Sequence, residues 1–134
     1  MNQLEQRLKK VLTGEGAILK AMEPMARHTT FRIGGPAQWY AAPSGDEELR
    51  ELLAVCRSEN LKIRILGNGS DLLVSDEGCD GLVISMTENF SWGATEGTCL
   101  RAGAGLLLPK AASMAFREGL SGLEFASGIP GTVG

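Results

Sequence analysis

A glycine-rich segment, Gly67-Asn68-Gly69-Ser70-Asp71, directly follows an apolar run with the length and β-branched content of a strand. Backbone N–H groups in such a bend can converge on an anion, because glycine has no Cβ to hold the anion away. No Gly-Lys-Ser/Thr follows, and no third glycine completes Gly-x-Gly-x-x-Gly here or at Gly103-Ala104-Gly105. The composition leaves two interpretations open, a phosphate cradle and a structural tight turn.

A second segment with little side-chain bulk forms the last eight residues, Ser127-Gly128-Ile129-Pro130-Gly131-Thr132-Val133-Gly134. Its N–H and hydroxyl groups would suit a diphosphate or a flat ring lying against the chain. Taken alone, however, the segment is more typical of an ordinary loop between two elements.

The segment from His28 to Ala37 (HTTFRIGGPA) could present a charged side chain from a structured loop. We expect a turn at Gly34-Gly35, with Phe31 and Ile33 inserted into the core. Arg32 could contact a ligand, although a solvated arginine is the commoner case. His28 is more typical of a hydrogen-bonded loop histidine than of a catalyst.

The residues that usually bind metals are sparse. Cys56, Cys79 and Cys99 are odd in number, far apart and without a Cys-x-x-Cys pair. We therefore expect reduced, buried or half-buried thiols rather than a disulfide framework or a zinc site. His28 is the only histidine, and no acidic run has EF-hand spacing, so no metal centre is predicted.

Composition indicates an ordinary globular domain. The 134 residues suffice for one domain, 43% are hydrophobic, 22% are charged, and the net charge is −3. No basic surplus suggests nucleic acid as a partner, and no apolar run approaches the ~20 residues that cross a bilayer. Because Met1 precedes a charged segment rather than a signal sequence, we expect a cytoplasmic protein without membrane insertion.

The periodicity of the N-terminal half predicts a helix at 4–12, a mostly extended or looping segment at 14–37, a strand that begins at its last residue and spans 37–43, a helix at 44–60 and a strand at 61–67. Strand, helix and strand in this order predict a βαβ unit with parallel strands. The glycine bend then lies at the carboxyl end of the second strand, where open α/β sheets bind ligands.

The helix at 44–60 has the clearest signals. Ser44 and Glu47 match a capping box, and Asn60 suits a left-handed exit. One apolar face contains Leu49, Leu52, Leu53 and Cys56.

The C-terminal half predicts strands at 81–86 and 98–105, with a weaker strand near Phe90. Pro109 can open a helix that Gly119 ends. We expect the buried face of that helix to contain Leu108, Ala111, Ala112, Ala115 and Phe116. No period predicts structure after residue 119.

Together and in this order, three segments (28–37, 65–84 and 102–134) resemble the N-terminal flavin-binding part of the UDP-N-acetylenolpyruvoylglucosamine reductase family. The resemblance covers about residues 20–134, less than half of the usual chain of that family. It implies an α+β fold of the vanillyl-alcohol-oxidase (PCMH) type, in which two α/β subdomains hold FAD and a substrate domain follows. Residues 1–20 would be an N-terminal helix and lead-in, and 21–134 an incomplete FAD-binding domain.

The resemblance also implies which residues bind FAD. The family loop around the pyrophosphate maps onto Gly67, Asn68, Gly69, Ser70, Asp71, Leu72 and Leu73. The segment that lines the flavin maps onto Ser127, Gly128, Ile129, Pro130, Gly131, Thr132, Val133 and Gly134. Asp71 replaces the usual asparagine, and a carboxylate beside a diphosphate should weaken FAD binding unless it turns outward or is protonated.

The implied reaction is the NADPH-dependent reduction of a UDP-sugar enol ether in peptidoglycan precursor synthesis. The serine proton donor of the family and its assisting arginine and glutamate would lie beyond residue 134, so no catalytic residue is predicted in this chain. The UDP-sugar would bind the substrate domain that follows. We expect a fragment that is inactive alone. Another flavin oxidase of the same fold and a non-catalytic FAD- or nucleotide-binding module remain alternatives.

Overall fold

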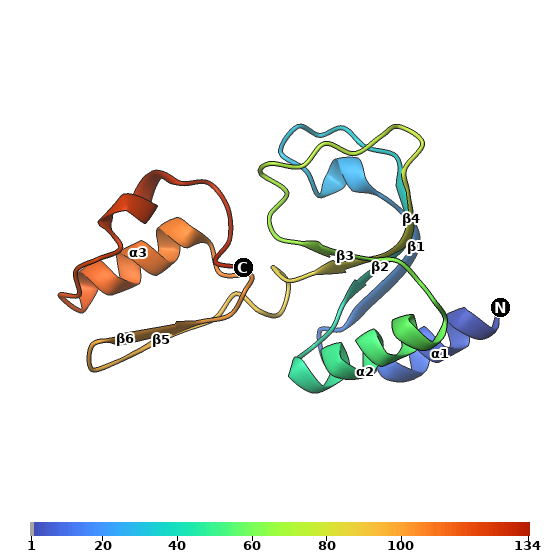
Figure 1. Cartoon of the computed structure of the whole chain (residues 1–134), viewed down its shortest axis with the longest axis horizontal. Coiled ribbons are helices and arrows are strands. Elements are labelled where there is room, and N and C mark those ends of the chain that lie inside the picture. Colours follow the sequence, from blue (N-terminus) through green and yellow to red (C-terminus); the bar gives the residue numbers. More distant parts are fainter. Residues whose placement is uncertain (1) are drawn as a thin grey trace.

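The structure, a computed structural model, describes residues 2–134, which form two units lying side by side (Figure 1). The N-terminal unit (residues 2–90) contains α1 (Gln3–Val11), β1 (Ile18–Pro24), the 3-10 helix η1 (Met25–Arg27), β2 (Pro36–Ala42), α2 (Asp46–Ser58), β3 (Ile63–Leu66) and β4 (Cys79–Ser85). The C-terminal unit (residues 91–134) contains β5 (Gly93–Glu96), β6 (Cys99–Ala102), α3 (Leu108–Arg117) and the 3-10 helix η2 (Glu124–Gly128). The C-terminus returns to the junction between the two units.

The N-terminal unit is built on a four-stranded mixed sheet of order β1-β2-β4-β3. β1 is antiparallel to β2, whereas β2 and β3 both run parallel to β4. The predicted βαβ unit is therefore confirmed, with β4 inserted between its two strands. The carboxyl ends of β3 and β4 meet at the edge that faces the C-terminal unit (Figure 1).

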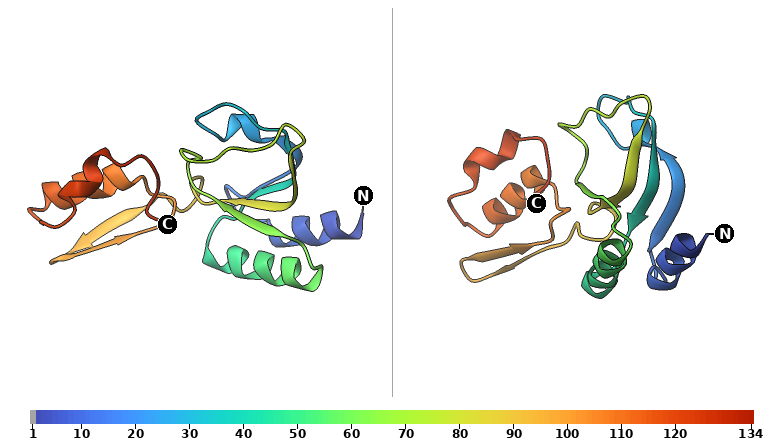
Figure 2. Two further views of the ribbon diagram at one scale, coloured as in Figure 1. Left: turned by 45° about the horizontal axis from the view of Figure 1, so that its top comes forward. Right: turned by 45° about the vertical axis from the view of Figure 1, so that its right-hand side comes forward.

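Each face of this sheet has its own core, because successive strand residues point to opposite faces. Trp39 and Ala41 of β2 pack with Leu82 and Ile84 of β4 under α1 and α2. The alternate residues, Tyr40 and Val83, pack with Met25 of η1 on the other face. Figure 2 shows the two helices below the sheet and η1 with two long loops above it. The loops at 28–35 and 67–78 are thus held against a packed surface.

α1 belongs to the same core. Leu8 is fully buried among residues of α2 and the sheet, and burial of such a side chain contributes about 2 kcal/mol. β1 already begins at Ile18. The domain boundary expected at residue 20 stays a prediction.

The C-terminal unit is thinner. β5 and β6 form a two-stranded hairpin, and α3 lies over it (Figure 2). α3 and the hairpin lie close together because small residues face each other between them. A Cβ at Gly93 would lie 2.8 Å from Met114 Sδ. Three alanines of α3 (Ala111, Ala112 and Ala115) are buried.

β1 is the element least visible in the sequence. It lies in the segment expected to be mostly extended or looping, and most of its residues are half-buried or exposed. The strand forms because β2 pairs with it from Ile18↔Ala42 to Pro24↔Pro36. Tertiary pairing, rather than local pattern, defines it.

The capping box predicted from Ser44 and Glu47 is wrong. α2 begins at Asp46 behind an N-cap at Gly45, which has no side chain to cap with. Glu48, one residue later, accepts hydrogen bonds from the backbone N–H groups of Ser44 (2.7 Å), Thr13 (3.0 Å) and Gly14. The left-handed exit at Asn60 is confirmed by its φ of 51°.

Several apolar residues expected inside are outside. Phe31 is 57% exposed and Ile33 is 48% exposed, because backbone hydrogen bonds hold their loop without core insertion. Phe116 is 85% exposed, since the narrow hairpin covers only the alanine strip of α3. Cys99 is also exposed. Phe90 is buried in the N-terminal core instead of forming a strand, and β5 begins three residues later.

Within residues 2–134, no helix combines the length and the apolar character that crossing a membrane requires. Nor do three or more His, Cys, Asp or Glu side chains of this stretch gather in a way that could hold a metal ion.

Candidate functional site

The glycine bend follows Leu66, the buried last residue of β3, as the sequence predicts. Gly69 has φ +68°, and a Cβ there would lie 2.0 Å from the carbonyl oxygen of His28. Its own carbonyl accepts hydrogen bonds from Thr30 N–H (3.2 Å) and Thr30 Oγ1 (3.0 Å). The bend is therefore fastened to the loop at 28–35, and glycine is required at position 69.

The C-terminal segment reaches the same bend. A Cβ at Gly67 would lie 2.5 Å from Thr132 Oγ1, so the Thr132 side chain lies directly against the bare backbone of Gly67. Leu108 N–H donates to the Gly131 carbonyl (2.9 Å), and Val133 N–H donates to the Leu106 carbonyl (2.8 Å). These backbone bonds hold the end of the chain beside the bend.

The structure brings together only some of the predicted site residues. Both segments contribute to one shallow hollow of about 290 Å³, lined by residues 65–72 with Gly131, Thr132 and Gly134. Ser127 lies in a different hollow over α3, and residues 128–130 are exposed. Leu72 packs against the core, whereas Leu73 is 73% exposed. Asp71 is exposed at the edge of the hollow.

A larger cleft of about 570 Å³ opens on the other side of Gly67 and Asn68. This volume lies within the usual range for ligand sites, about 300–1,000 Å³. The cleft is lined by Arg27, His28, Thr29, Thr30, Arg32, Leu66, Gly67, Asn68, Ser85, Thr87, Ser91, Gly105 and Leu107. None of these described lining residues is acidic, although the chain carries a net charge of −3. The cleft therefore concentrates positive charge and hydrogen-bond donors.

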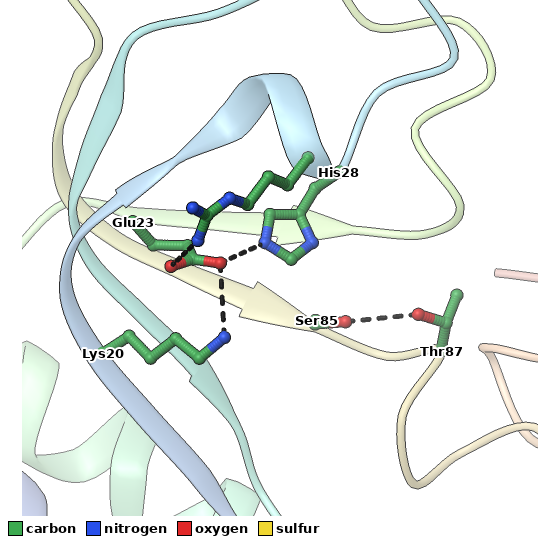
Figure 3. A network of polar contacts seen from close by, with 6 residues as sticks. Lys20, Glu23, His28, Ser85 and Thr87 are labelled. Carbon is green, nitrogen blue, oxygen red and sulfur yellow. Dashed lines mark hydrogen bonds and ion pairs between the residues drawn. The ribbon is translucent and has the colours of Figure 1, made fainter. Parts of the chain in front are cut away.

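Glu23 pairs with two side chains that line the cleft, those of His28 and Arg27, and also with Lys20. Figure 3 shows its contacts with His28 and Lys20. Glu23 is 5% exposed and pairs with His28 Nε2 (2.9 Å), Lys20 Nζ (3.3 Å) and Arg27 Nη1 (3.8 Å). Burial would raise the pKa of Glu23, but the hydrogen bonds from His28 and Lys20 outweigh it and hold that pKa below its usual value. His28 is thus a hydrogen-bonded loop histidine, as expected.

The His28 ring also stacks on Tyr40, with ring centroids 4.3 Å apart. The Tyr40 hydroxyl is buried and has no partner in hydrogen-bonding geometry within the described chain. Burial raises the pKa of this phenol, and the nearby Ser85 hydroxyl offsets part of the rise. Ser85 Oγ lies 3.3 Å from Thr87 Oγ1 at the cleft (Figure 3). Ser85, Thr87 and Ser91 thus make this side of the cleft rich in hydroxyl groups.

Sequence reasoning missed Glu23, Thr87 and Ser91 as residues that build the site. Ser91 Oγ donates to the carbonyls of Thr87 and Gly105 (3.0 Å for the latter), which fixes the connection between the units. No spacing rule links these positions, because they meet only when β1, β4 and the connection pack together. The segment at 28–37 was a detectable signal, and four of its residues line the cleft: His28, Thr29, Thr30 and Arg32.

The donor set fits a cofactor with a diphosphate. The backbone N–H groups of the glycine bend, a cleft without carboxylates and the two arginines together suit anionic oxygens. Within the bend, the Ser70 N–H donates to Asn68 Oδ1 (3.3 Å). The hollow between the bend and residues 131–134 offers further room beside the same bend.

Comparison with known proteins agrees with this chemistry. Residues 37–134 match the FAD binding domain family. Over all 134 residues the chain is 47% identical to UDP-N-acetylenolpyruvoylglucosamine reductase 2 of Symbiobacterium thermophilum, of which it covers 43%. The chain therefore spans less than half the length of the curated relative.

Solved structures give the same result for the fold. The crystal structure of UDP-N-acetylenolpyruvylglucosamine reductase from Thermus caldophilus matches with a TM-score of 0.66 and 38% identity, over 88% of this chain and 40% of that chain. A BBE-like 1 variant from Physcomitrella patens matches with a TM-score of 0.61 over 87% of this chain and 26% of that one; at 18% identity it supports the fold alone. The α+β fold of the FAD-binding PCMH type is therefore confirmed. The chain belongs to the FAD binding domain family and is related along its length to part of the UDP-N-acetylenolpyruvoylglucosamine reductases.

Proposed function

We propose that this chain holds FAD as the cofactor-binding portion of a UDP-N-acetylenolpyruvoylglucosamine reductase. The whole enzyme would reduce the enol ether of UDP-N-acetylglucosamine enolpyruvate to UDP-N-acetylmuramate, with NADPH as the reductant, in cytoplasmic synthesis of peptidoglycan precursors. The relatives carry the reductase name, and the match extends through both predicted flavin segments.

One observation carries the proposal. Two segments about sixty positions apart, both poor in side chains, meet at Gly67 and Thr132 beside a cleft that no described carboxylate lines. The two segments meet in the smaller hollow, and the glycine bend lines both this hollow and the cleft beside it. A dinucleotide cofactor requires such a place, because its diphosphate must lie against backbone donors.

The residues of this chain would bind and orient the cofactor. The backbone of the glycine bend would hold the diphosphate, and Gly131 with Thr132 would close the adjoining hollow. FAD, when bound, supplies the redox chemistry. The reaction adds a hydride and a proton across a carbon–carbon double bond, and the proton donor would belong to the part of the enzyme outside residues 1–134.

Titration of the chain with FAD tests the proposal. We expect saturable quenching of flavin fluorescence and a shift of the visible flavin spectrum. Thr132→Val, which keeps the shape but removes the hydroxyl, should weaken binding, whereas Thr98→Val in the exposed β5–β6 turn should not. Free-flavin fluorescence and an unshifted spectrum at saturating protein would contradict FAD binding.

The isolated chain should not oxidise NADPH in the presence of the UDP-sugar enolpyruvate, because the substrate-binding part and the proton donor are expected elsewhere. Substrate-dependent NADPH oxidation by the pure chain would contradict the assignment of substrate binding and proton donation to another part of the enzyme.

A further inference from the structure

Arg32 occupies a strained position in the loop that covers the sheet. Its φ is +55°, in the left-handed region that residues other than glycine rarely adopt. A hydrogen bond from its N–H to the Thr29 carbonyl (3.1 Å) closes the turn, and Thr29 Oγ1 donates to the Ile33 carbonyl (3.1 Å). The loop therefore fixes this conformation. Strain of this kind is concentrated at functional sites.

Arg32 also differs from the other positively charged or ionisable groups of the cleft. Arg27 and His28 both interact with Glu23, and Figure 3 shows the contact with His28. Within residues 2–134, by contrast, the Arg32 guanidinium has no hydrogen-bond or ion-pair partner. It is the one arginine that lines the cleft with its charge uncompensated by the protein.

We propose that Arg32 is a ligand-binding residue, whose guanidinium binds a phosphate of the anionic ligand in the cleft. A planar guanidinium can donate two parallel hydrogen bonds to one phosphate, which makes it suited to this task. The ligand is the FAD diphosphate if the proposed function holds, and the inference rests on that function for the identity of the ligand. Phosphate binding then accounts for both the strained backbone of Arg32 and its unpaired guanidinium.

Two substitutions separate the charge from the strain. Arg32→Ala removes the guanidinium but keeps a Cβ at positive φ, so the melting temperature of the free chain should stay unchanged. Arg32→Gly removes both, and the melting temperature should rise by about 3 °C. Both variants should bind FAD about tenfold more weakly, the loss expected for a charge-assisted hydrogen-bonded contact.

Arg50→Ala is the matched control, since Arg50 is an exposed arginine of α2 outside the cleft. FAD affinity should be measured by fluorescence quenching at low and high ionic strength. Wild type and Arg50→Ala should lose affinity with salt to the same extent, and the two Arg32 variants should lose less, because one ionic contact is missing. Unchanged FAD affinity in Arg32→Ala, or a lower melting temperature in Arg32→Gly, would overturn the inference.

A melting-temperature experiment with inorganic pyrophosphate tests the role of Arg32 independently of FAD binding. Pyrophosphate should raise the melting temperature of the wild type and not that of Arg32→Ala. If FAD does not bind but pyrophosphate shows this difference, the proposed function fails and the role of Arg32 stands. If FAD binds equally well to wild type and Arg32→Ala, the role of Arg32 fails and the proposed function stands.

Discussion

The two units are stabilised to very different degrees. The sheet of the N-terminal unit is covered on both faces, by α1 and α2 on one side and by η1 with its loops on the other. In the C-terminal unit α3 covers one face of a two-stranded hairpin, and Phe116 and Phe125 are 85% and 70% exposed. The proposed site draws its glycine bend from the first unit and residues 131–134 from the second. Changes in the first unit should therefore affect folding and binding together, whereas changes in the second should cost less stability.

Two glycines with nearly equal φ give the largest expected contrast. Gly69 has φ +68° and Gly119 has φ +69°, but only at Gly69 would a Cβ meet backbone, 2.0 Å from the His28 carbonyl oxygen. Gly119→Ala should lower the free energy of unfolding by about 1 kcal/mol, the cost of the backbone conformation alone. Gly69→Ala should lower it by about 3 kcal/mol or more, because the loop at 28–35 must also move.

Urea denaturation followed by circular dichroism measures both changes, and flavin quenching measures binding. Gly69→Ala should lose FAD binding, and Gly119→Ala should keep it. Equal losses of stability in the two variants would show that the bend is not rigidly docked, and the contrast between the units would fail.

Two glutamates give a smaller contrast that depends on pH. Burial tends to raise the pKa of Glu48, but hydrogen bonds from the N–H groups of Ser44, Gly14 and Thr13 outweigh it, so this pKa lies below its usual value of 4.5. A carboxyl group with a lowered pKa stabilises the fold above its unfolded pKa, and the contribution is lost as pH falls through the folded pKa. Glu48→Gln should therefore lower the free energy of unfolding by about 1 kcal/mol at pH 7.

The difference between Glu48→Gln and wild type should shrink as pH falls below about 4.5, where the wild-type carboxyl group becomes protonated. Glu124 is the control in the C-terminal unit, since it accepts one hydrogen bond from Gly122 N–H (2.8 Å) in an exposed turn. Glu124→Gln should leave the urea midpoint unchanged. A Glu48→Gln deficit that does not decrease as pH falls below 4.5 would indicate a shape effect rather than the carboxylate hydrogen bonds.

The elements that sequence reasoning predicted well are those with local signals. The apolar period of α2, the left-handed Asn60 and the bend after β3 depend on neighbouring residues and were confirmed. β1 has no such signal, because pairing with β2 defines it. Glu48 took the place expected for Glu47, since the capping geometry depends on the approach of the chain at Thr13 and Gly14.

The site shows the same division between local and tertiary information. The glycine segments were visible as composition, but their meeting at Thr132 follows from packing across about sixty residues. Glu23 lies in β1 and pairs with His28 beyond η1, and no sequence spacing relates the two in advance. Phe31 was assigned to the core on hydrophobicity alone, which ignores that backbone hydrogen bonds can hold a loop without inserting its apolar side chains.

The smallest expected effect concerns Asp71, at the position where the family resemblance implies an asparagine. Asp71 is exposed at the edge of the hollow that Gly131 and Thr132 also line. Because the carboxylate is in contact with water, its repulsion of a bound diphosphate should be about 1 kcal/mol rather than the several expected for a buried charge. Asp71→Asn should then tighten FAD binding about fivefold, with a weaker effect at high salt. Asp76→Asn, an exposed change on the same loop but outside the hollow, is the control. Equal FAD affinities of Asp71→Asn and wild type in a fluorescence titration would show that the Asp71 carboxylate does not repel the bound diphosphate.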